Sequence, residues 1–269
     1  MNGLVDTLLA RLAAGEQGVL VRVHATQGSA PREAGTWMAV WDEDLTGTIG
    51  GGQLEFQATQ EARNWLAGGA AIEEVRRYPL GPTLGQCCGG VVFLAYQRIG
   101  PEHVADLRAE LTAHLNPVAL FGGGHVGAAL ARLLSTLPFS VRWIDSRDGV
   151  FPPQLPVQIE TEHSEPVQDA VAQLATGSRV LIMSFSHAED LDIVIACLRR
   201  QRERGDLPYI GLIGSKTKWA TFRHRLEARG FTQAEMAHIT CPIGVPGITG
   251  KEPEVIAVAV AAQLLQSLR

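Results

Sequence analysis

The sequence has little cysteine, few aromatic residues and no excess of basic charge. Only four of its 269 residues are cysteine and none forms a C-x-x-C pair, so a structural zinc site is not expected. Acidic residues (28) outnumber lysine and arginine (23), and the net charge of -5 argues against nucleic acid or an anionic membrane surface as the main partner. No apolar run approaches the roughly 20 residues of a membrane span.

A secretory leader is also not expected. The opening stretch MNGLVDTLLARLAAGEQ has an acidic residue inside its apolar part and no small-residue cleavage site. We therefore expect a cytoplasmic protein whose cysteines remain thiols. The sequence shows no internal repeat or low-complexity tract, and its length suffices for two modest domains.

Residues 117–269 predict a Rossmann-like domain, an α/β fold with a doubly wound parallel sheet. Apolar strands are expected at 117–121, 179–185 and 209–213, and the second of these is too apolar for a surface strand. Helical patterns follow these strands. The last helix, at 252–268, has small and apolar residues through most of its length and should pack on the sheet.

The stretch GGGHVG follows the first of these strands and begins a helix, which is the context of a dinucleotide-binding loop. Gly122, Gly124 and Gly127 would let the backbone turn and approach a phosphate at the helix N-terminus. A second strand ends on Asp145, 18 residues beyond Gly127, where a carboxylate that binds ribose is expected. Arg147 has two possible roles: it could bind a ribose 2'-phosphate or pair with Asp145.

Further polar residues stand near the expected ends of these strands. His125 and His187 are candidate acid–base groups, although a lone histidine is more often structural. Ser215, Lys216 and Lys218 follow the strand at 209–213, where ligands bind in such folds. The alternative for the lysines, which lie in the first turn of a helix, is that they are simply solvated.

The first half predicts an α+β domain over residues 1–100, with a mostly antiparallel sheet, and a connecting segment over residues 101–116 that holds a short helix. An amphipathic helix opens the chain. The strands are expected at 18–25, 36–41, 46–49, 71–78 and 91–96, and a second helix at 53–67.

Two polar, glycine-rich loops of this half are candidate binding sites. In TQGSAPR, the side chains of Gln27, Ser29 and Arg32 offer the donors that recognise phosphate or a polar heterocycle. In GGGQLE, Gly51 belongs to a glycine triplet and Gln53 follows it at the start of a helix, an arrangement typical of an anion-binding turn. Ordinary glycine turns between strands are the alternative for both loops.

The stretch GQCCGG places two of the four cysteines side by side. Neighbouring Cα atoms lie about 3.8 Å apart, so a disulfide between Cys87 and Cys88 would be strained and easily reduced. Two thiols on a glycine-rich backbone could instead hold a soft metal or a sulfur atom in transit. The alternative is a tight turn whose cysteines are small buried apolar groups.

Together these motifs resemble one family, the XdhC/CoxI-type accessory proteins of molybdenum hydroxylases such as xanthine dehydrogenase. GQCCGG is the most distinctive of them, and they run in order across nearly the whole chain. The matching stretches are ATQGSAPREAG (25–35), GTIGGGQLE (47–55), GQCCGG (85–90), LFGGGHVG (120–127), IDSRDGVFP (144–152), YIGLIGSKTKW (209–219) and CPIGVPGITGKEPEVIAVAVAAQLL (241–265).

The resemblance implies a protein that binds the molybdenum cofactor, as molybdopterin or its dinucleotide form. Such a protein holds the cofactor while a cysteine desulfurase supplies a sulfur ligand, and then passes it to an apo molybdenum hydroxylase. It is expected to form a homodimer. On this reading Cys87 and Cys88 contact the metal, with Gln86 and Gln53 as secondary contacts, and the loop at Gly122 holds a nucleotide, either part of the cofactor or NAD(P).

Two other functions remain open. An NAD(P)-dependent oxidoreductase could use the adjacent cysteines as a redox couple, although no Tyr-x-x-x-Lys pair follows the glycine loop. A non-catalytic sensor of nucleotide or redox state is the third possibility. Nicotinamide binding and substrate-dependent NADH oxidation would distinguish the oxidoreductase from the accessory protein.

Overall fold

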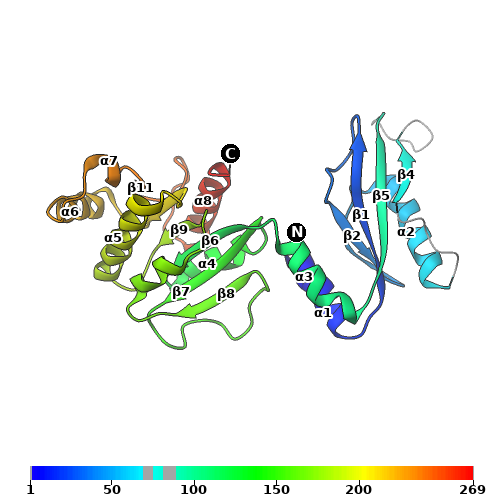
Figure 1. Cartoon of the computed structure of the whole chain (residues 1–269), viewed down its shortest axis with the longest axis horizontal. Coiled ribbons are helices and arrows are strands. Elements are labelled where there is room, and N and C mark those ends of the chain that lie inside the picture. Colours follow the sequence, from blue (N-terminus) through cyan, green and yellow to red (C-terminus); the bar gives the residue numbers. More distant parts are fainter. Residues whose placement is uncertain (1, 69–74, 81–88, 269) are drawn as a thin grey trace. The chain divides into compact units, whose positions relative to one another are not determined.

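The chain forms two compact units, Gly3–Ala113 and His114–Arg269, in the computed structural model (Figure 1). The structure describes residues 2–68, 75–80 and 89–268. Each unit has a sheet and a hydrophobic core of its own. In these described ranges, no helix has both the length and the apolar character needed to cross a bilayer.

The first unit contains a five-stranded sheet in the order β3-β2-β1-β5-β4, and every neighbouring pair is antiparallel. This confirms the predicted antiparallel sheet. Its strands are β1 (Gly18–Gln27), β2 (Trp37–Val40), β3 (Leu45–Gly47), β4 (Val75–Pro79) and β5 (Val91–Ile99).

Helix α2 covers one face of this sheet. Alternate residues of β1, including Val19 and Val21, share a core with Leu54, Ala58 and Ala62 of α2. The period of two along the strand and of about four along the helix brings these apolar side chains together. The helical segments of the unit are α1 (Asn2–Ala13), α2 (Gly52–Leu66), the 3₁₀ turn η2 (Pro101–His103) and α3 (Val104–Thr112).

The second unit contains a six-stranded sheet in the order β11-β10-β9-β6-β7-β8, and all neighbouring strands are parallel. The predicted Rossmann-like fold is therefore confirmed. Its strands are β6 (Asn116–Phe121), β7 (Phe139–Asp145), β8 (Ile159–His163), β9 (Arg179–Ile182), β10 (Tyr209–Leu212) and β11 (Ile239–Thr240).

Helices cover both faces of this sheet. On β6, Val118 and Leu120 pack toward α4 and α8, whereas Ala119 and Phe121 pack toward α5 and η3. Burial on both faces explains why the central strands are almost entirely apolar. The helical segments are α4 (His125–Leu134), η3 (Val167–Gln173), α5 (His187–Arg204), α6 (Lys216–Glu227), α7 (Gln233–Met236) and α8 (Pro253–Gln266).

The order of strands has a reversal beside β6. The chain proceeds from β6 to β7 and β8 on one side, and then returns to place β9 and β10 on the other. Loops at the carboxyl ends of β6 and β9 therefore diverge in opposite directions. Ligands of such sheets bind in the crevice at this switch point.

Candidate functional site

The glycine loop after β6 can be built only with glycine at two positions. Gly122 has a φ of +120°, and a Cβ atom there would lie 2.0 Å from the carbonyl oxygen of Met183. A Cβ on Gly127 would lie 2.0 Å from the carbonyl oxygen of Gly122. The indole N–H of Trp143 donates to that same oxygen at 2.9 Å. Through these contacts α4 packs closely on the end of β6, and the direction in which the N-terminus of α4 points is fixed.

The next glycine has a different environment. Gly124 is the N-cap of α4 in an extended conformation, and nothing lies within 4 Å of the position that its Cβ would occupy. Gly124 and His125 are both exposed. The first N–H groups of a helix have no partner within it. A phosphate can therefore approach the backbone at the start of α4, and the predicted phosphate loop fits this geometry.

Asp145 ends β7 beside this loop and is bound by the chain's own groups. Its Oδ2 accepts hydrogen bonds from the Gly123 N–H at 2.6 Å and from Arg147 Nη2 at 2.9 Å, while Oδ1 accepts from the Arg147 N–H and Nε. Burial acts to raise the pKa of Asp145, but these hydrogen bonds outweigh it and the pKa lies below its ordinary value. Of the two roles for Arg147, the structure shows the pair with Asp145.

An aromatic side chain that the sequence did not single out lies against this pair. The guanidinium of Arg147 stands 4.6 Å from the centre of the Phe185 ring, and Phe185 is 67% exposed. Phe185 belongs to the loop between β9 and α5. The stacked pair spans the carboxyl ends of β7 and β9, next to the glycine loop.

The loop after β9 is held by a buried ion pair. Asp190 accepts from both the N–H and the hydroxyl of Ser184, and Lys218 Nζ donates to Asp190 at 2.5 Å and to the Ile213 carbonyl at 2.8 Å. Both charged side chains are at least nine-tenths buried. The alternative that Lys218 is simply solvated is therefore wrong, because Lys218 reaches across to α5.

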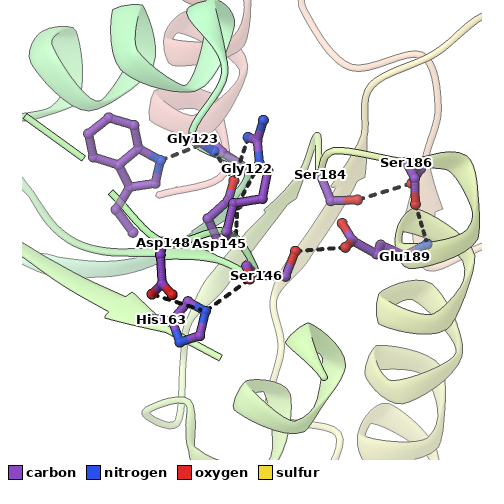
Figure 2. Close-up of polar contacts among 11 residues, drawn as sticks. Gly122, Gly123, Asp145, Ser146, Asp148, His163, Ser184, Ser186 and Glu189 are labelled. Atoms are coloured by element: carbon purple, nitrogen blue, oxygen red, sulfur yellow. Dashed lines mark hydrogen bonds and ion pairs between the residues drawn. The ribbon is translucent and has the colours of Figure 1, made fainter. Parts of the chain in front are cut away.

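A second carboxylate of α5 faces β7. Ser146, which follows Asp145, donates from its hydroxyl to Glu189 Oε1 at 2.7 Å (Figure 2). The other oxygen, Oε2, is buried and has no hydrogen-bond partner among the residues that the structure describes. His187, the first residue of α5, is exposed. The sequence indicated His187 as a candidate, but no pattern in it pointed to Glu189.

The glycine triplet of the first unit already has an anionic partner. Glu55 Oε2 accepts from the N–H groups of Ile49 and Gly51 and from the hydroxyl of Thr48, at 3.0, 3.1 and 2.6 Å. The backbone does form the predicted anion-binding turn, but a carboxylate from the first turn of α2 fills it. Gln53, two residues before Glu55 in the same helical turn, is exposed.

Described residues of three sequence motifs lie close together in the first unit. A Cβ on Gly90, the last residue of GQCCGG, would lie 2.4 Å from the Ser29 carbonyl and 2.5 Å from that of Gln27. A Cβ on Gly50 would lie 2.9 Å from Pro31. The loop at 26–32 therefore packs against Gly90 and Gly50. The side chains of Gln27, Ser29 and Arg32 are exposed there.

Gln86, Cys87 and Cys88 lie outside the described residues, and their contacts with the cofactor stay predictions. In the part of the chain that is described, no group of three or more histidine, cysteine or acidic side chains is arranged to hold a metal ion. Burial raises the pKa of the Cys197 thiol to about 12, as expected of an inert core cysteine. Cys241 is half-buried.

Fold and site together define a two-part protein, an antiparallel α+β unit followed by a Rossmann unit with an exposed glycine at the start of α4. The pattern of the XdhC and CoxI family matches residues 11–79, and that of the XdhC Rossmann domain matches residues 118–264. The chain therefore belongs to the XdhC family.

Two known proteins are similar over most of the chain. The uncharacterized protein YqeB of Escherichia coli K12 is 24% identical over 257 residues, which cover 92% of this chain but only 43% of YqeB. The chain thus spans less than half of that relative. A crystal structure described as a xanthine dehydrogenase from Bacillus halodurans is 19% identical, with a TM-score of 0.72. The matched region covers all of this chain and 95% of that one. This similarity supports the fold of the chain.

Proposed function

We propose that the protein is an accessory factor for a molybdenum hydroxylase of the xanthine dehydrogenase type. It binds the molybdenum cofactor, holds it while a sulfur ligand is installed, and delivers it to the apo-enzyme. The observation that carries this proposal is the match to both family patterns, in order, within one chain. The partners that follow from it are the client hydroxylase, a cysteine desulfurase and a second copy of this chain.

In this proposal the first unit binds the metal end of the cofactor. The bound group supplies a pterin dithiolene and a molybdenum atom that can take a sulfur ligand. Cys87 and Cys88 are proposed as the soft contacts to molybdenum, because thiolates suit a metal–sulfur centre. Gln27, Ser29 and Arg32 support the assignment, since their exposed side chains stand on the loop against which Gly90 packs.

The second unit binds a nucleotide in this proposal. Gly122 and Gly127 fix the start of α4, and the open space at Gly124 admits a phosphate group. A pyrophosphate at a helix N-terminus is stabilised by free N–H groups and by the helix dipole. The nucleotide is part of the dinucleotide form of the cofactor or a separate molecule such as NAD(P).

The first test measures cofactor binding directly. The full-length protein is incubated with molybdenum cofactor, freed of unbound cofactor and analysed for molybdenum and pterin. We expect stoichiometric binding by the parent and loss of most of the molybdenum in Cys87→Ala and Cys88→Ala. Cys241→Ala, which removes a thiol of the second unit, is the matched control and should bind as the parent does.

Two outcomes would contradict the proposal. If folded Cys87→Ala and Cys88→Ala variants retain the cofactor, the cysteines are not its contacts. If the parent binds no cofactor but oxidises NADH in the presence of a substrate, the protein is an NAD(P)-dependent oxidoreductase and not an accessory factor.

A further inference from the structure

The carboxylate that a dinucleotide fold normally offers to ribose is already engaged in this protein. Asp145 stands at the expected place, at the end of β7, but it is 2% exposed and both of its oxygens accept hydrogen bonds from Arg147 and the Gly123 N–H. A ribose could reach Asp145 only by displacing a two-point contact with a guanidinium, which is among the strongest that a carboxylate makes. Another side chain must therefore accept the hydrogen bonds of the sugar hydroxyl groups.

Glu189 has the unused hydrogen-bonding capacity that Asp145 lacks. One carboxylate oxygen is fixed by the Ser146 hydroxyl, whereas Oε2 is buried and finds no donor in the described part of the chain. A buried oxygen left without a donor destabilises the folded state, and native proteins rarely keep one without a reason. The backbone of Glu189 is held as well, because its N–H donates to Ser186 Oγ, the N-cap of α5.

The position of Glu189 is suited to a sugar. Ser146 directly follows Asp145, so the hydrogen bond between Ser146 and Glu189 brings the carboxylate from β9's side of the switch point to the end of β7 (Figure 2). The ribose of a nucleotide whose phosphates lie at the glycine loop is found at this end of the second strand. The pKa of Arg147 is raised by its hydrogen bond to Asp145, and the nearby charge of Glu189 adds to this effect. The exposed Phe185 ring lies against the same guanidinium.

We propose that Glu189 is the ribose-binding carboxylate of this protein and accepts hydrogen bonds from the sugar hydroxyls of a nucleotide whose phosphates bind at the start of α4. This inference rests on the proposed nucleotide site of the second unit and adds the residue that selects its ligand. The ligand class is a ribonucleotide with a diphosphate and free hydroxyls. Asp145, in this arrangement, is a positioning residue that holds the glycine loop and Arg147.

The test compares ribose and dideoxyribose ligands. ADP and CDP, together with their 2',3'-dideoxy forms, are titrated calorimetrically into the full-length protein and into Glu189→Gln. The Glu189→Gln change keeps the size of the side chain and removes its charge. Because a hydrogen bond to a charged group is worth roughly 10-fold or more in affinity, we expect the variant to lose about that factor for the ribonucleotides. For the dideoxy ligands it should lose little.

The comparison of ligands separates recognition from a structural role. Glu203→Gln, an exposed glutamate on the same helix, is the matched control and should bind as the parent does. Equal losses for ribose and dideoxyribose ligands would show that Glu189 only shapes the site. Unchanged affinity for all ligands, or failure of both ADP and CDP to bind the parent, would also overturn the inference. The molybdenum-binding assay is a separate readout, so either proposal can fail without the other.

Discussion

Two glycine loops in this protein begin helices, and they differ in what binds their N–H groups. At Ile49–Gly52, the N–H groups of Ile49 and Gly51 donate to Glu55 in the first turn of α2. At Gly122–Gly124, Asp145 accepts from one N–H, and the first turn of α4 contains no acidic residue. A glycine turn before a helix thus predicts an anion-binding backbone. Whether a ligand can use it depends on whether the chain supplies its own carboxylate.

The largest effect is expected from Gly122→Ala. Its Cβ would meet backbone at 2.0 Å, and the φ of +120° is unfavourable for alanine, so the free energy of unfolding should fall by at least about 3 kcal/mol. Urea denaturation measures this loss. The matched change in the first unit, Gly51→Ala, has no atom within 4 Å and strains only φ, so about 1–2 kcal/mol is expected there. Equal losses would contradict the different packing of the two loops.

Asp145→Asn should cost roughly 2 kcal/mol, because it weakens the acceptor of the Gly123 N–H and the partner of Arg147. The pKa of Asp145 is lowered in the folded state, so its contribution to stability is present above the ordinary aspartate value of 3.8 and is lost as the pH falls below it. The parent should therefore lose more stability than the variant between neutral and acid pH. Urea midpoints across that range test this, and identical pH dependence would exclude the ionised pair.

Glu55→Ala should cost about 1–2 kcal/mol and free the N–H groups of Ile49 and Gly51. Removing the internal carboxylate should also make the first loop resemble the second. We expect phosphate to raise the melting temperature of the variant more than that of the parent. Glu43→Ala, which removes an exposed charge of the same unit, is the control. An equal response of all three proteins to phosphate would mean that the loop is not an anion site.

Gly124→Ala should have the smallest effect on stability, less than about 0.5 kcal/mol, since its φ is -72° and space is open around it. The added methyl group would point into the region through which a phosphate approaches. ADP binding should therefore weaken although thermal unfolding is unchanged. Unaltered affinity would place the phosphate elsewhere on the unit.

Local patterns predicted most of the fold. The apolar run before GGGHVG and the helix after it identified β6 and α4, because a buried parallel strand and a glycine turn both leave strong local signals. Strands β8 and β11 were not predicted. Ile159–His163 is mostly polar and β11 has two residues, so these edge strands depend on pairing with β7 and β10.

The candidate site was less predictable, because its contacts join distant parts of the chain. Ser146 and Glu189 are 43 residues apart, and Lys218 and Asp190 are 28 apart. No local pattern indicates which of several carboxylates a serine or lysine will reach. Glu55 is the exception: an acidic residue in the first turn after a glycine triplet was a visible sign that the turn could be capped internally.

Transfer of the cofactor tests the central proposal most directly. Purified protein loaded with molybdenum cofactor is mixed with an apo molybdenum hydroxylase, with and without a cysteine desulfurase, and hydroxylase activity is measured. The proposal predicts strong activation that depends on the loaded protein and increases with the desulfurase, and none from Cys87→Ala or Cys88→Ala. Activation by free cofactor alone to the same level, with no contribution from this protein, would contradict it.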